Sequence, residues 1–132
     1  MNTFINLKKG SEIVSAIIEH CKANSISSAY ISAIGAVSEA EIGFYDFKKK
    51  EYYFKKFEED LELINLTGNI ALFNGSIVFH AHATLADPDY NVIGGHLKSA
   101  IVSGACEIFI TVLDKQLERA HDKDSGLNLI QS

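Results

Sequence analysis

The sequence predicts an α+β domain with a mainly antiparallel β-sheet and one or two flanking helices. Many short segments alternate apolar and polar residues, and most of the connections between them are of hairpin length. Helical spacing of apolar residues is clear in only one segment. With 132 residues, 47% of them hydrophobic, and a single proline, the chain can bury a core of its own. We therefore expect one compact domain spanning residues 1–132.

The first two elements are a short strand at residues 4–7 and a helix that ends at Asn24. Ser11 has a side-chain oxygen suited to accept from a free amide in the first helical turn, so it is the predicted N-cap. Ile13, Ile17 and Cys21 follow at helical spacing. They predict the face that packs on the sheet.

The remaining elements are predicted as strands. Thr67-Gly68-Asn69 should interrupt one run, and Asn74-Gly75 is a strong signal for a two-residue hairpin. Residues 98–104 are ambiguous between helix and turn, whereas residues 106–113 are β-branched and apolar enough for a fully buried central strand. The predicted strands are residues 28–37, 41–47, 51–57, 61–66, 70–73, 77–85, 91–97, 106–113 and 127–130.

Charge and cysteine content limit the possible partners and the compartment. The formal net charge is −5 and Arg119 is the single arginine, which opposes neutralisation of duplex DNA phosphates. Cys21 and Cys106 are far apart and lack C-x-x-C spacing, so we expect free thiols in a reducing compartment. The first residues lack the apolar core of a signal peptide, and no apolar run reaches membrane-spanning length. The sequence therefore predicts a cytoplasmic protein without membrane contact.

Three of the five histidines lie between Gly75 and Leu97. Alternation along residues 77–85 places His80 and His82 on one strand face, roughly 6.6 Å apart. Asp87-Pro88-Asp89 is strong turn chemistry, so the chain should return as an antiparallel partner. A turn centred near Asp89 places His96 opposite His82, at a Cα separation of roughly 5 Å. Three imidazoles would then converge, as in a metal site.

Two alternatives stay open at this point. A shift of the turn by half a residue, or a bulge at Gly94-Gly95, would redirect His96 away from the other two rings. His-x-His on a strand also occurs as an exposed polar face or as a hydrogen-bonded pair. If the site forms, imidazole suits zinc and other divalent transition metals, with zinc as the default.

Several of these segments resemble the PPC domain (plants and prokaryotes conserved), also called DUF296, over nearly the whole chain. The similar segments are His80-Ala81-His82-Ala83 with Leu85-Ala86, Gly94-Gly95-His96-Leu97, Glu62-Leu63-Ile64, Leu66-Thr67-Gly68-Asn69-Ile70, Ser32-Ala33-Ile34-Gly35, and Leu117-Glu118-Arg119 followed by Asp122 and Gly126-Leu127. The resemblance implies a compact domain assembled as a homotrimer. It also implies a metal, commonly zinc, held by His80, His82 and His96.

The resemblance further implies a regulatory or DNA-associated role, because the family is described as DNA-binding. Plant members carry an Arg-Gly-Arg-Pro-type AT-hook and a Gly-Arg-Phe-Glu-Ile-Leu hexapeptide that recruits protein partners. This sequence contains no AT-hook, and residues 59–64 read Glu-Asp-Leu-Glu-Leu-Ile. Together with the charge, this argues against direct DNA contact and leaves a protein partner as the alternative.

The sequence leaves two main functions open and assigns no catalytic residue. One is a trimeric, cytosolic, metal-binding regulatory module. The other is a small zinc-dependent enzyme in which three histidines leave a position for an activated water. A carboxylate near the site is a candidate general base for such an enzyme, and Asp87, Asp89, Glu41 or Glu107 could serve, with no choice among them from sequence.

Overall fold

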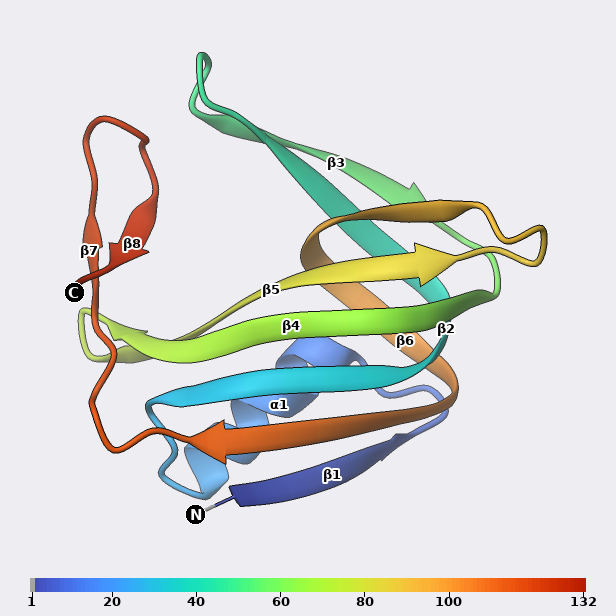
Figure 1. The fold of residues 1–132 in the computed structure, drawn as a ribbon, viewed down its shortest axis with the longest axis horizontal. Coiled ribbons are helices and arrows are strands. Elements are labelled where there is room, and N and C mark those ends of the chain that lie inside the picture. Colours follow the sequence, from blue (N-terminus) through green and yellow to red (C-terminus); the bar gives the residue numbers. More distant parts are fainter. Residues whose placement is uncertain (1) are drawn as a thin grey trace.

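The computed structural model describes residues 2–132. Within them the chain forms eight strands and one helix (Figure 1). In chain order these are β1 (Asn2–Lys8), α1 (Ile13–Ala23), β2 (Ala29–Asp46), β3 (Glu51–Phe57), β4 (Leu61–Phe73), β5 (Ser76–Ala86), β6 (Val92–Val112), β7 (Arg119–His121) and β8 (Asn128–Ile130). Among residues 2–132, no helix is long and apolar enough to cross a membrane.

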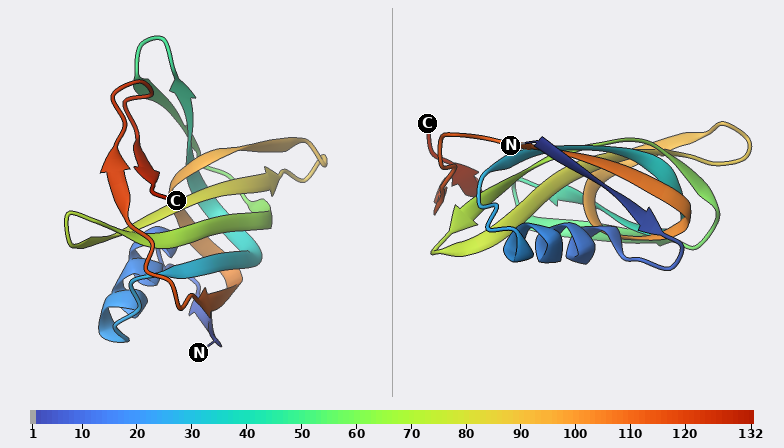
Figure 2. Two further views of the ribbon diagram at one scale, coloured as in Figure 1. Left: turned by 60° about the vertical axis from the view of Figure 1, so that its left-hand side comes forward. Right: turned by 90° about the horizontal axis from the view of Figure 1, so that it is seen from below.

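The main sheet has six strands in the order β1-β6-β5-β4-β2-β3, and β6 also pairs with β2. This extra pairing closes β2, β4, β5 and β6 into a ring, with β1 and β3 attached at its edges. Strands β7 and β8 form a separate two-stranded arm beside the turn between β4 and β5 (Figures 1 and 2). All pairings between named strands are antiparallel, which confirms the predicted sheet type.

Three long strands replace several shorter ones that the sequence predicted. Strand β2 joins residues 28–37 to residues 41–47, and bulges near Gly35, Val37 and Glu41 let it bend while it stays paired with β6. Strand β6 runs through residues 98–104, where helix or turn was expected. The predictions of separate strands and of a non-strand segment there were wrong, because pairing with β2 imposes extended backbone.

Strand β4 is also continuous, so the predicted break at residues 67–69 was wrong. Gly68 lies where β5 comes very close. A Cβ there would be 2.3 Å from the carbonyl oxygen of His80. The glycine thus permits close pairing of β4 with β5 and does not end the strand.

The helix covers the inner face of the sheet (Figure 2, right). Ile13, Ile17 and Cys21 are fully buried, as predicted. The predicted cap was wrong, because Glu12 is the N-cap residue. Its carboxylate accepts from the amides of Val14 at 2.8 Å and Ser15 at 2.9 Å.

The core lies between α1 and this inner face. Cys106, Ile108 and Ile110 of β6 are buried there, while the residues between them are exposed. Residues 106–113 are therefore a half-buried strand and not the fully buried one predicted. Both cysteines are buried free thiols, and burial raises the pKa of each to about 11.

Two tight turns fix the ends of β5. Asn74 and Gly75 have φ values of 49° and 78°, the left-handed conformation required in this two-residue hairpin. At the other end, the Asp87 carboxylate accepts from the amides of Asp89 and Asn91, each at 2.9 Å. Both turns were predicted from sequence, and the second sets the register of β6.

Candidate metal centre

The three histidines lie on the outer face of the sheet, opposite the helix. His82 pairs with Thr67 of β4, and His80 pairs with Asn69. The residues that alternate with them, Ala81 and Ala83, are 3% exposed and belong to the core. The predicted assignment of faces along residues 77–85 is therefore confirmed.

The hairpin register brings His96 to the same place. His82 and His96 are direct partners in the β5–β6 pairing, as predicted from the turn. Gly95 allows β6 to pass close to β2, because a Cβ there would be 2.6 Å from the Gly43 carbonyl oxygen. The bulge that would have redirected His96 does not occur between β5 and β6.

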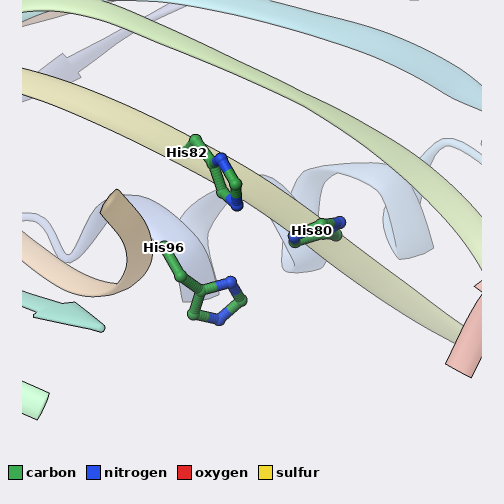
Figure 3. Close-up of side chains that lie close together, drawn as sticks. All are labelled: His80, His82 and His96. Atoms are coloured by element: carbon green, nitrogen blue, oxygen red, sulfur yellow. The ribbon is translucent and has the colours of Figure 1, made fainter. Parts of the chain in front are cut away.

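The imidazole rings form a compact triangle (Figure 3). The centroids lie 5.2 Å apart for His80–His82 and His80–His96, and 6.1 Å apart for His82–His96. One ring nitrogen from each residue can be chosen so that all three lie within 4.8 Å of one another. Three nitrogens bound to one zinc at about 2.0–2.1 Å are roughly 3.3 Å apart, so modest ring rotations complete the convergence.

Burial keeps two of these rings neutral. It lowers the pKa of His80 to about 4, assisted by the nearby charges of His96, Arg119 and His82. Burial, and then the charge on His82, also lowers the pKa of His96. A neutral imidazole has the free lone pair that a metal needs.

The histidine cluster fits a divalent transition metal. The Nδ1 atom of His96 is buried and has no hydrogen-bond partner among the described residues. Buried polar atoms nearly always have a partner, so this nitrogen is available for a ligand. A set of three imidazole nitrogens suits zinc, copper, iron or nickel better than the oxygen-preferring magnesium or calcium.

A pocket of about 330 Å³ opens beside two of the histidines. Tyr52 of β3 forms one wall and packs against His96 in a tilted arrangement, with ring centroids 4.6 Å apart and an interplanar angle of 36°. Arg119 of β7 enters from the arm and donates to Asn69 Oδ1 at 2.6 Å and to the Asn128 carbonyl at 2.8 Å. The residues lining the pocket are Tyr52, Val78, Phe79, His80, His96, Arg119, Leu127, Asn128 and Leu129.

None of the four acidic residues considered as a general base lines this pocket. The Asp87 carboxylate accepts hydrogen bonds from Asn91 and Asp89 within its own turn, and these hydrogen bonds lower its pKa. Asp89 lies in the same turn, Glu41 forms an ion pair with Lys98 at 3.2 Å, and Glu107 borders a different hollow. The structure therefore brings the histidines together without any of these carboxylates.

Sequence reasoning missed Tyr52 and Arg119 as site residues. Arg119 was conspicuous as the single arginine, but its position after several strands gave no indication that β7 returns to β4. Tyr52 belongs to a correctly predicted strand, yet its contact with His96 depends on β2 pairing with both β3 and β6.

Comparison with known proteins identifies the family to which this fold belongs. The model of the Plants and Prokaryotes Conserved (PCC) domain family matches residues 2–114. The chain belongs to this family, which confirms the resemblance noted in its sequence motifs. The match ends before β7, so Arg119 lies outside the matched residues. The comparison with curated proteins found no significant match.

Solved structures agree closely with this fold. A "putative dna binding protein" from Bacteroides thetaiotaomicron is 36% identical, with a TM-score of 0.95 over 98% of this chain and 91% of its own. A "metal-containing protein" from Archaeoglobus fulgidus is 41% identical, with a TM-score of 0.94 over 100% and 94%. A plant- and prokaryote-conserved protein from Pyrococcus horikoshii is 31% identical, with a TM-score of 0.93 over 100% and 92%.

Proposed function

We propose that this PCC-domain protein binds one divalent transition metal, with zinc as the default, through His80, His82 and His96. The convergence of three ring nitrogens within 4.8 Å is the observation that carries the proposal. The Archaeoglobus relative, described as metal-containing, supports it at 41% identity. Imidazole ligands alone do not select zinc, so availability in the cell contributes to the choice of metal.

The site would be open and not purely structural. Structural zinc sites are usually closed by four protein ligands, whereas reactive sites have three and leave a position for water or substrate. The described residues offer three ligands here, and both cysteines are buried in the core away from the cluster. A zinc ion in such a site supplies a Lewis acid and lowers the pKa of a bound water. This favours a site that binds a small ligand, and it keeps a small zinc-dependent enzyme as the second candidate function.

A regulatory or DNA-associated role is the function that the family suggests. Relatives from Bacteroides and Ralstonia are described as "putative DNA-binding" proteins. This chain has a net charge of −5, so we propose that any association with DNA runs through a protein partner. The cytoplasm is the proposed compartment, since two buried free thiols suit a reducing environment. A gel shift with AT-rich duplex at physiological salt tests whether the chain binds DNA directly. A shift at nanomolar protein would contradict the proposal that a protein partner is required.

We also propose a homotrimer. Phe4 and Phe109 are direct cross-strand partners on the outer face and are 63% and 58% exposed. Tyr30 and Ile34 of β2 continue this apolar surface and are 45% and 53% exposed. Large exposed apolar surfaces on a folded chain commonly mark subunit contacts. Light scattering at micromolar concentration should report three times the chain mass, and a monomer would refute the trimer.

Metal analysis of the purified chain tests the central proposal. The wild type should retain about one zinc per chain after dialysis, as for a single site. His82→Ala should lose it without unfolding, because His82 is exposed and lies outside the core. His20→Ala and His121→Ala are matched controls that should keep the metal. Equal zinc content in the wild type and His82→Ala would refute the site.

A further inference from the structure

We propose that the pocket beside the three histidines binds a small organic carboxylate, with Arg119 as the residue that recognises its negative charge. This inference rests on the proposed metal site and adds the class of ligand. It would make the outer face of the sheet a two-part site, in which the histidines hold the metal and Arg119 holds the carboxylate.

The position of Arg119 is fixed by the sheet. Its guanidinium donates to Asn69, and Asn69 is the direct cross-strand partner of His80. Its second hydrogen bond goes to the Asn128 carbonyl, which ties the guanidinium to β8. Arg119 therefore reaches the pocket next to a proposed metal ligand, with its orientation set before any ligand arrives.

The arm that carries Arg119 is itself anchored at several points. The Leu72 amide donates to the Leu117 carbonyl at 2.9 Å, which joins the chain before β7 to the end of β4. On the other side, Tyr45 Oη donates to the Ser125 carbonyl at 2.5 Å and Lys50 Nζ donates to the Lys123 carbonyl at 2.7 Å. Such preorganisation reduces the entropic cost of binding a ligand.

Arg119 carries a positive charge that no carboxylate among residues 2–132 neutralises through an ion pair. The ion pairs among the described residues involve Lys56 and Lys98, and none includes Arg119. Its Nε is buried and has no hydrogen-bond partner there. A partly buried cation without a counter-ion is unfavourable, and three neutral imidazoles holding a divalent ion would add further positive charge. An anion bound in this pocket would therefore be stabilised by the charge of Arg119.

The walls of the pocket indicate an organic anion. Apart from its charged and polar residues, the pocket is lined by the apolar side chains of Val78, Phe79, Leu127 and Leu129 and by the ring of Tyr52. Its volume of about 330 Å³ is at the lower end of the roughly 300–1,000 Å³ range of small-molecule sites. Sites for phosphate typically combine several cationic side chains or the amides at a helix N-terminus. This pocket has one arginine and no lysine, which favours a carboxylate.

Calorimetric titration of the zinc-loaded full chain tests the inference. Butyrate is the probe, butyramide is its neutral counterpart, and inorganic phosphate is the competing anion. Butyrate should bind at least about tenfold more tightly than butyramide, because charge-assisted hydrogen bonds exceed neutral ones by about that factor. Arg119→Gln should weaken butyrate binding by about tenfold or more and leave zinc content unchanged. Lys9→Gln, which removes an exposed cation outside the pocket, is the matched control.

A second variant guards against an indirect effect of Arg119→Gln on the arm. Leu127→Trp should fill the pocket and abolish butyrate binding while the guanidinium and zinc content stay as in the wild type. Equal butyrate affinity in the wild type and either pocket variant would overturn the inference. Arg119-dependent binding of phosphate in preference to butyrate would overturn the assignment of a carboxylate. Zinc-loaded protein that binds neither anion refutes this inference alone, whereas protein that takes up no zinc refutes the proposed metal site.

Discussion

Strand β5 has two faces that differ in how their side chains are satisfied. On the inner face, Ala81, Ala83 and Leu85 are at most 3% exposed and pack in the core. On the outer face, His80 and His82 meet His96, and one buried nitrogen of this cluster has no protein partner. The inner face is packed in the core, while the outer face carries the histidines that we propose as metal ligands. Folding and metal binding should therefore be separable by single substitutions on one strand.

Leu85→Ala should have the largest effect, because it creates a cavity at a fully buried position. We expect a loss of about 2–5 kcal/mol in the free energy of unfolding, measured by denaturant titration in the presence of a chelator. His82→Ala under the same conditions should change stability by less than about 0.5 kcal/mol, as for most surface substitutions. Similar losses in the two variants would show that the faces are not independent.

Added zinc should stabilise the wild type through the outer face. At a free concentration of 100 times Kd, binding to the native state alone contributes about 2.7 kcal/mol. This increment should vanish in His82→Ala and persist in His20→Ala, as measured by the zinc-dependent shift of the unfolding transition. An unchanged increment in His82→Ala would mean that zinc acts elsewhere.

The helix cap tests the inner face with a smaller effect. Glu12→Ala should cost about 1 kcal/mol, because two first-turn amides lose their acceptor. The Glu12 carboxylate also accepts from the Ala100 amide at 3.2 Å, so the same substitution loosens the contact between α1 and β6. Ser11→Ala is the control and should have little effect. A larger loss of stability in Ser11→Ala than in Glu12→Ala would instead identify Ser11 as the N-cap residue.

The smallest expected effect is a pH dependence of the metal-free protein. The pKa of His80 is lowered from 6.5 to about 4, so between these pH values the unfolded chain binds a proton that the native ring does not. Stability should therefore fall as the pH decreases from about 6.5 to 4, and solvent access to this half-buried ring should moderate the change. Denaturation at several pH values should show a weaker slope in His80→Gln than in wild type. Rising stability on acidification, absent in that variant, would contradict the assignment.

The sequence alone predicted the local parts of the site, and left open only whether the hairpin register brings His96 to the other two histidines. The two-residue period of a strand places His80 and His82 together, and the turn chemistry of Asp87 to Asp89 sets the pairing of His82 with His96. Both depend on residues within a single hairpin, where spacing along the chain determines spacing in the fold. The helix stripe at Ile13, Ile17 and Cys21 was predictable for the same reason.

The tertiary structure decided everything that depends on pairing between distant segments. Strand β2 stays extended between its two predicted strands, and β6 stays extended through residues 98–104, because each is held by partners on both sides. The same pairings bring Tyr52 to His96, and the anchored arm brings Arg119 to Asn69. Periodicity fixes the direction in which a side chain points from its own strand. Which strand lies opposite is settled by closing the ring around one core, and that is a property of the whole chain.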